Sequence, residues 1–226
     1  MQFQTPTIIA TIALLIVPFI LLFEKIEATT WTERLAHPSF VTEPNRHTPL
    51  FPTAQYLPSR ITNNTVIDSS QKVIAIAGTV IIPPNSNLTI PAGTTIAFHE
   101  HSKLVVEGTL VAIGTPTRRI RFVSNESHPD NQTWNGIEIA SGGKATIEYT
   151  LLKHGDPAIS CLSGSAAEVH DSIISNGNVG VYSQTTNCSI SNTTIQGPLY
   201  GIVALGHEPL MSNLQIVARK LDILRL

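Results

Sequence analysis

The sequence predicts an all-β fold, a parallel solenoid with three short strands per coil, preceded by an N-terminal hydrophobic helix. Three observations predict it. Apolar residues recur every 21 or 22 positions in the second half of the chain, short β-branched runs alternate with Gly, Pro, Asn and Ser, and an uncharged apolar run stands near the N-terminus. Together they indicate a hydrophobic leading segment, a spacer and one β domain.

The first element is the apolar run from Thr7 to Phe23, which is 17 residues long and uncharged. A membrane-spanning helix needs about 20 apolar residues and at least about 17, whereas the apolar part of a secretory signal is about 7–15 residues long. We therefore interpret residues 1–28 as a transmembrane anchor, with a cleaved signal peptide as the alternative. Lys25 and Arg34 follow the run, and by charge alone they favour a cytoplasmic C-terminal side.

The next element, residues 29–70, is predicted to be a proline-rich spacer. It shows neither a helical nor a strand period, and it contains five prolines, at positions 38, 44, 49, 52 and 58. Such a composition is typical of an extended connection rather than a packed domain.

Residues 71–218 are predicted to form the solenoid, and residues 219–226 a short C-terminal cap. No helical pattern of ten or more residues follows the apolar run. Three apolar columns keep phase over four units at steps of 21 or 22 residues: Ile137, Ile159, Val181 and Ile202; Ile147, Val169, Ile190 and Met211; Leu152, Ile174, Ile195 and Ile216. Helical repeats are excluded by the Ser, Thr, Gly and Asn content, so stacked β coils remain.

The spacing persists without the residue identities because the two have different causes. Each strand lies about 4.8 Å above its equivalent in the previous coil, and backbone hydrogen bonds between coils do not depend on side chains. Inward side chains must be apolar and aligned to fill a narrow core. Outward ones need only be soluble.

The bulk composition excludes several classes. Charged residues are 13% of the chain, the net charge is -2, and Lys and Arg are scattered, so no nucleic-acid partner is expected. No cofactor and no metal site is expected, since the chain has no CxxC motif. Cys161 and Cys188 both fall in phase with inward rows but on different strands of the coil, which predicts two buried free cysteines rather than a disulfide.

One stretch resembles a known family. "LTIPAGTTIAFHEHSKLVVEGTLVAIGTPTRRIRFVS" followed by "WNGIEI" is similar to the first coils of right-handed parallel β-helix proteins of the pectin-lyase-like superfamily, bacterial surface type. The matching residues are Leu88, Ile90, Pro91, Gly93, Thr94, Ile96, Phe98, Leu104, Val106, Gly108, Leu110, Ala112, Gly114, Ile120, Phe122, Ser124, Trp134, Gly136 and Ile137. The resemblance covers about residues 72–216 and is specific for fold, because this fold hosts lyases, hydrolases and adhesins. It implies export, which places the body of the protein outside the cytoplasm despite Lys25 and Arg34.

Enzymes of that superfamily need clustered carboxylates, and glycosidases need two carboxyl groups about 5–9.5 Å apart. No outward column of this sequence stacks two acids. The strongest pair is Glu148 and His170, one coil apart, which is either a ligand or acid–base pair or an ordinary exposed salt bridge. Trp134 and Tyr182 are further exposed binding candidates, Trp134 being alternatively a packing residue. No catalytic residue is assigned.

Six Asn-x-Ser/Thr sequons occur, at Asn63, Asn87, Asn125, Asn131, Asn187 and Asn192. We interpret them as products of Asn-rich turns, as the resemblance to bacterial proteins implies.

The sequence thus predicts a non-catalytic, membrane-anchored β-helix on the cell surface, held in the membrane by residues 7–23 or secreted after cleavage. Its expected partner is a polysaccharide or a cell-surface protein. The alternative is a carbohydrate-active enzyme, a polysaccharide lyase or glycoside hydrolase.

Overall fold

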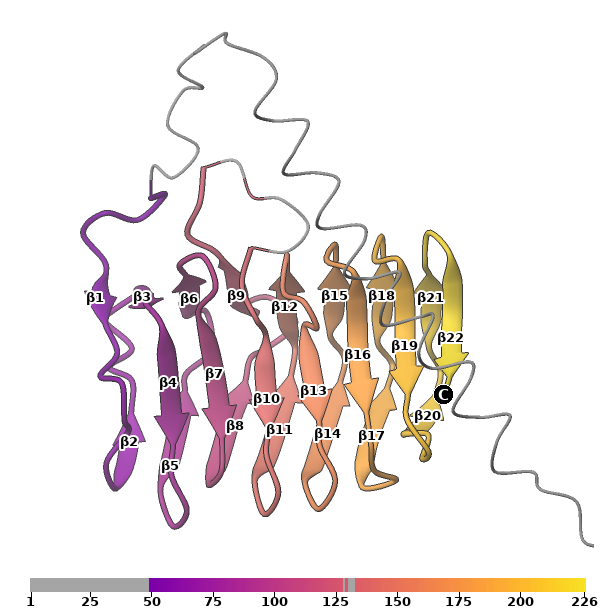
Figure 1. Cartoon of the computed structure of the whole chain (residues 1–226). Helices are drawn as coiled ribbons and strands as arrows, with labels where there is room; N and C mark the ends of the chain where they lie inside the picture. Colours follow the sequence, from indigo (N-terminus) through magenta and orange to yellow (C-terminus); the bar gives the residue numbers. More distant parts are fainter. Residues whose placement is uncertain (1–48, 128, 130–132) are drawn as a thin grey trace, which may run out of the picture. The chain divides into compact units, whose positions relative to one another are not determined.

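The computed structural model describes residues 49–127, 129 and 133–226, and all regular structure within them is β-strand. The 22 strands form three sheets in which every pair of neighbours is parallel (Figure 1). One strand from each sheet makes one coil, and the described chain makes about eight coils. The predicted parallel β-solenoid with three strands per coil is confirmed for these residues.

The three sheets have the following strands, in spatial order. Sheet 1 contains β1 (Gln55–Tyr56), β3 (Val73–Ile76), β6 (Thr95–Phe98), β9 (Ile120–Ser124), β12 (Thr150–Lys153), β15 (Ile173–Ser175), β18 (Thr194–Gln196) and β21 (Gln215–Val217). Sheet 2 contains β4 (Thr79–Ile82), β7 (Lys103–Val106), β10 (Ile137–Ile139), β13 (Ile159–Cys161), β16 (Val179–Ser183), β19 (Tyr200–Ala204) and β22 (Leu221–Arg225). Sheet 3 contains β2 (Asn64–Val66), β5 (Asn87–Ile90), β8 (Thr109–Ile113), β11 (Lys144–Glu148), β14 (Ala166–His170), β17 (Cys188–Ser191) and β20 (Leu210–Ser212).

The predicted apolar columns are confirmed as vertical stacks. Ile147 pairs in register with Val169, Val169 with Ile190, and Ile190 with Met211. The columns headed by Ile137 and Leu152 pair in the same way. Nearly all their members are buried, and they form one continuous core inside the coils. Burial of these side chains, each contributing about 1.5–3 kcal/mol, is the main force that closes the coil.

The strands extend beyond the predicted β-helix range at both ends. β1 and β2 lie within residues 29–70, the predicted spacer, and their side chains are mostly exposed, so they carry no apolar alternation. β22 lies within residues 219–226, the predicted cap, and pairs with β19. There Ile223 lies in register with Ile202, at the same step of 21 residues.

The predicted N-terminal helix at residues 7–23 lies outside the described residues, as does most of the spacer. Within the part of the chain that the structure describes, no helix has the length and apolarity needed to cross a membrane.

The expectation of two free cysteines is wrong: Cys161 and Cys188 form a disulfide. Cys161 ends β13 in sheet 2 and Cys188 begins β17 in sheet 3 of the next coil. Their Cα atoms are 6.3 Å apart and both side chains are fully buried. The end of one strand and the start of the next converge at a corner of the coil, so inward residues on different sheets meet there.

A second corner, between sheets 3 and 1, repeats one backbone conformation in four coils. Its residues have φ between 46° and 52°: Tyr149, Asp171, Asn192 and Asn213. Side chains in this left-handed conformation are uncommon, and Asn and Asp tolerate it best. The Asn213 side-chain amide donates a hydrogen bond to Asn192 Oδ1 at 2.7 Å, which links two coils.

Candidate functional site

Glu148 and His170, the predicted pair, lie side by side at this second corner. They end β11 and β14 and pair in register. His170 Nε2 lies 3.7 Å from Glu148 Oε2. Both side chains are partly exposed, so the attraction between them is modest in free energy.

Asp171 joins this pair, which the sequence analysis missed. His170 Nδ1 lies 3.1 Å from Asp171 Oδ2, so the imidazole stands between two carboxylates. Reasoning by outward columns placed Asp171 with Tyr149 and Asn192, apart from Glu148. The signal that could have found it is adjacency to His170 at a turn, where the left-handed backbone of Asp171 brings its side chain back beside its neighbour.

The cluster of Glu148, His170 and Asp171 presents one ring nitrogen and two carboxylate oxygens, all within 4.8 Å of one another. Imidazole and carboxylate are ligand types for divalent ions such as Zn²⁺ and Mn²⁺. Its three side chains are between 25% and 32% exposed. The arrangement is therefore able to hold a cation or to shuttle a proton, and it lies on an outward corner.

Trp134 is not the exposed residue that the sequence predicts. Its side chain is fully buried, it stacks on Phe98 with ring centroids 3.9 Å apart, and its Nε1 donates to the carbonyl oxygen of Lys153 at 2.9 Å. The structure therefore shows the packing alternative. A ring with no exposed face has no surface on which a sugar could stack.

Tyr182 lies on the outward face of sheet 2, between Ser160 and Val203. Its hydroxyl accepts a hydrogen bond from Gln184 Nε2 at 2.8 Å. Since Glu148 and His170 lie in sheet 3, Tyr182 is not part of their cluster. Of the four predicted binding residues, the structure brings together only Glu148 and His170.

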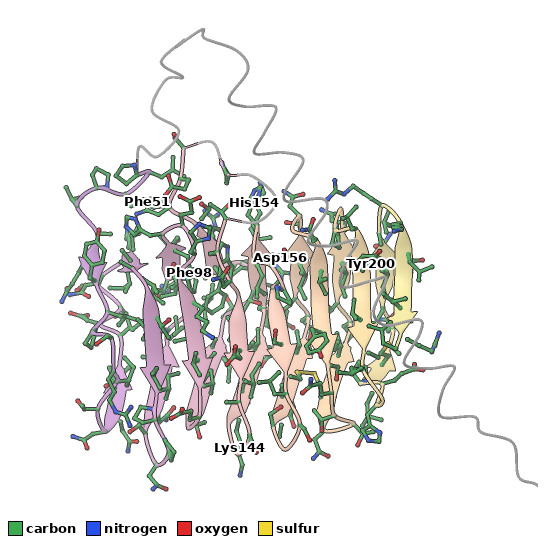
Figure 2. All side chains as sticks on the ribbon, in the orientation of Figure 1. Phe51, Phe98, Lys144, His154, Asp156 and Tyr200 are labelled. Atoms are coloured by element: carbon green, nitrogen blue, oxygen red, sulfur yellow. A yellow bond between two sulfur atoms is a disulfide. The ribbon has the colours of Figure 1, made fainter. Side chains whose placement is uncertain are left out.

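A larger feature lies on the outward face of sheet 1, where two cavities of about 330 and 530 Å³ adjoin. They share Lys72, Gly93, Thr95 and Arg121 in their lining. We call the joined cavities the basic groove, since their described lining includes Lys72, Arg118, Arg119, Arg121 and Lys153 but no Asp or Glu. Figure 2 shows Phe51 and His154, which line one end of it, at the opposite end of the coils from Lys144.

The cations of the basic groove differ in their partners. Arg118 donates from Nη2 to the carbonyl oxygen of Ala92 at 2.8 Å, and Arg119 donates from Nη1 to that of Asp171 at 2.6 Å. Lys72, Arg121 and Lys153 have no side-chain hydrogen bond and no ion pair within the described part of the chain. Three unpaired positive charges therefore face one concave surface.

No protein-family model, curated protein or solved structure matches the chain.

The sequence analysis missed the basic groove because its cations are far apart along the chain. Lys72 precedes β3, Arg121 lies in β9 and Lys153 ends β12. Winding of the coils places β3, β6, β9 and β12 next to one another in sheet 1. A 22-residue offset comparison begun at Arg121 would have reached the neighbourhood of Lys153 only by allowing for the longer loop after β9.

Proposed function

We propose that this protein is a non-catalytic, membrane-anchored extracytoplasmic β-helix that acts as a structural or binding module at the cell surface. The anchor is the apolar run at residues 7–23, and the coil is right-handed, of the pectin-lyase-like bacterial surface type. The partner is a polysaccharide or another cell-surface protein.

The observation that carries this proposal is the basic groove. It is concave, its floor includes the hydroxyl groups of Thr94 and Thr95, and its described lining has no carboxylate to act as acid, base or nucleophile. Catalysis on glycosides requires such groups, whereas recognition requires only complementary charge and hydrogen bonding.

The disulfide supports an extracytoplasmic location. Disulfides such as Cys161–Cys188 form and persist in oxidising compartments and are rare in the cytosol, where thiols are kept reduced.

One observation favours the alternative, a carbohydrate-active enzyme. The carboxylates of Glu148 and Asp171 converge within 4.8 Å, and a retaining glycosidase holds its two carboxyl groups about 5–5.5 Å apart. Neither residue lines a described cavity, however, so no groove delivers a sugar to them. We therefore rank binding first.

A glycan-array screen tests the proposed function. The full chain in detergent is applied beside a Glu148→Ala variant and a Lys72→Gln/Arg121→Gln/Lys153→Gln variant. We expect specific binding that the triple variant loses and Glu148→Ala keeps. Absence of binding to every glycan would leave only a structural role.

The enzyme alternative has its own test. The chain and a Glu148→Gln variant are incubated with acidic and neutral polysaccharides, and new reducing ends are measured. Release of sugar by the wild type that Glu148→Gln abolishes would establish catalysis and overturn the binding proposal.

A further inference from the structure

We infer that the basic groove binds a phosphate-bearing cell-surface polymer, with two or more phosphate groups lying along sheet 1 between Lys72 and Lys153. This inference rests on the proposed function and names the class of its ligand.

The charge distribution indicates an anion. Lys72, Arg121 and Lys153 are unpaired in the described structure, and Arg118 and Arg119 add positive potential from the rim. Unpaired like charges in one groove repel one another, so an anion that lies between them relieves this repulsion and gains attraction from each.

The donors favour phosphate over carboxylate. Arg121 presents a planar fork of N–H donors that matches two phosphate oxygens, and the two lysines act as point charges beside it. Ser69, Thr95 and Ser124 add hydroxyl groups to the described lining. A phosphate group offers more acceptor oxygens than a carboxylate, and these oxygens can be satisfied from several sides of a groove.

The length of the groove favours a polymer over a single ion. Arg121 pairs with Thr95 of β6 on one side and with Leu151 of β12 on the other, so the cations span the four neighbouring strands β3, β6, β9 and β12. At about 4.8 Å between strands, this span is about 14 Å. One phosphate group cannot contact both ends of it.

The lining argues against nucleic acid. Single strands are held by aromatic platforms on which successive bases stack. Phe51 is the single aromatic residue among the described lining residues, and it is half-buried at one end. A polymer whose repeating units carry phosphate without stacking bases, such as a phosphodiester-linked glycan, fits this surface.

The test uses the full chain in detergent and a linear polyphosphate as the probe, with binding measured by calorimetry at low and moderate salt. We expect binding that weakens as salt rises. A Lys72→Gln/Arg121→Gln/Lys153→Gln variant should bind at least about tenfold more weakly. A matched control, Arg60→Gln/Lys144→Gln/Lys220→Gln, removes the same charge from exposed positions outside the groove and should bind like the wild type.

Parallel titrations with polygalacturonate and with a single-stranded oligonucleotide separate the sources of negative charge. The inference is overturned if polyphosphate does not bind, if both triple variants lose affinity equally, or if either competing polymer binds more tightly than polyphosphate. Binding of an uncharged or uronate glycan through the groove would keep the proposed function and remove only the phosphate assignment. Circular dichroism of each variant verifies that the β-solenoid is intact.

Discussion

Gly136 illustrates how closely neighbouring coils approach one another. Its φ is 76°, and a Cβ placed on it would lie 1.8 Å from the carbonyl oxygen of Pro157 in the next coil. Gly142 has a similar φ of 81°, but a Cβ there would meet no atom within 4 Å. The two glycines therefore share the backbone requirement and differ only in the room around them.

Gly142→Ala should lower the free energy of unfolding by about 1 kcal/mol through backbone strain alone. Gly136→Ala should lower it by at least about 3 kcal/mol, because the clash is with backbone that cannot move without separating two coils. Urea unfolding followed by circular dichroism measures both. Equal effects would show that steric contact between the coils contributes nothing.

Asp156 joins two coils through its carboxylate. It accepts hydrogen bonds from the backbone N–H groups of Asn178 and Val179, at 3.2 and 3.0 Å, and from Asn178 Nδ2 at 3.1 Å. Figure 2 shows it near the end of the coils at which His154 lies. Burial raises the pKa of the Asp156 carboxyl above its ordinary value, and the backbone hydrogen bonds oppose this shift without cancelling it.

A carboxyl with a raised pKa holds its proton to higher pH in the folded chain than in the unfolded chain. Its contribution to stability is fully present below the unfolded pKa of 3.8 and is lost as pH rises through the folded pKa. Asp156→Asn should remove this part of the pH dependence while keeping an oxygen acceptor for Val179. Urea unfolding between pH 3.5 and 7 measures it, and an unchanged pH profile in the variant would contradict the assignment.

At the scale of elements, the inward column of sheet 1 shows how position along the solenoid sets the value of one residue type. Ile174 lies in β15 with coils on both sides and is fully buried. Ile216 occupies the equivalent place in β21, the last strand of sheet 1, and is only partly buried. Together with Met211 and Ile223 it lines a cavity of about 450 Å³ at this end.

Ile174→Ala should cost about 2–5 kcal/mol, because it leaves a cavity between two packed layers. Ile216→Ala should cost less than half as much, since its side chain already faces open space on one side. Thermal unfolding of both variants measures the difference. Similar losses would imply that the last coil is packed as tightly as the middle ones.

At the scale of the whole molecule, the coils form one stack in which each coil contacts mainly its two neighbours. The disulfide between Cys161 and Cys188 adds a covalent link between two consecutive coils in this stack. It closes a loop with a sequence separation of 27 residues, which restricts the unfolded chain.

Reduction of this disulfide should lower the free energy of unfolding by about 2–4 kcal/mol. Urea unfolding with and without reductant measures the change, with thiol titration in denaturant to verify each redox state. A Cys161→Ala/Cys188→Ala variant should be insensitive to reductant. Identical unfolding midpoints in both states would contradict a stabilising bridge.

Much of the solenoid could be predicted because its core imposes one condition on every coil. Inward side chains stack directly on their equivalents, so Ile147, Val169 and Ile190 must be apolar and must recur at a nearly constant step. The short terminal strands β1 and β22 carry too few inward residues to show that step, and they escaped prediction.

The site followed different rules. The pairing of Glu148 with His170 was predictable, since both lie in one outward column at the same step. Asp171 reaches them through the conformation of a turn, and Cys188 meets Cys161 across a corner between sheets. Neither relation is a step along a column.

The sequence by itself determined the class of fold, its parallel stacking and the phase of the three inward columns, because burial forces those positions to be apolar. Only the tertiary structure decided which outward and corner residues meet, including Lys72, Arg121 and Lys153 in the basic groove. Outward positions are under no packing constraint, and loops of unequal length separate them, so their neighbours are set by how the chain winds.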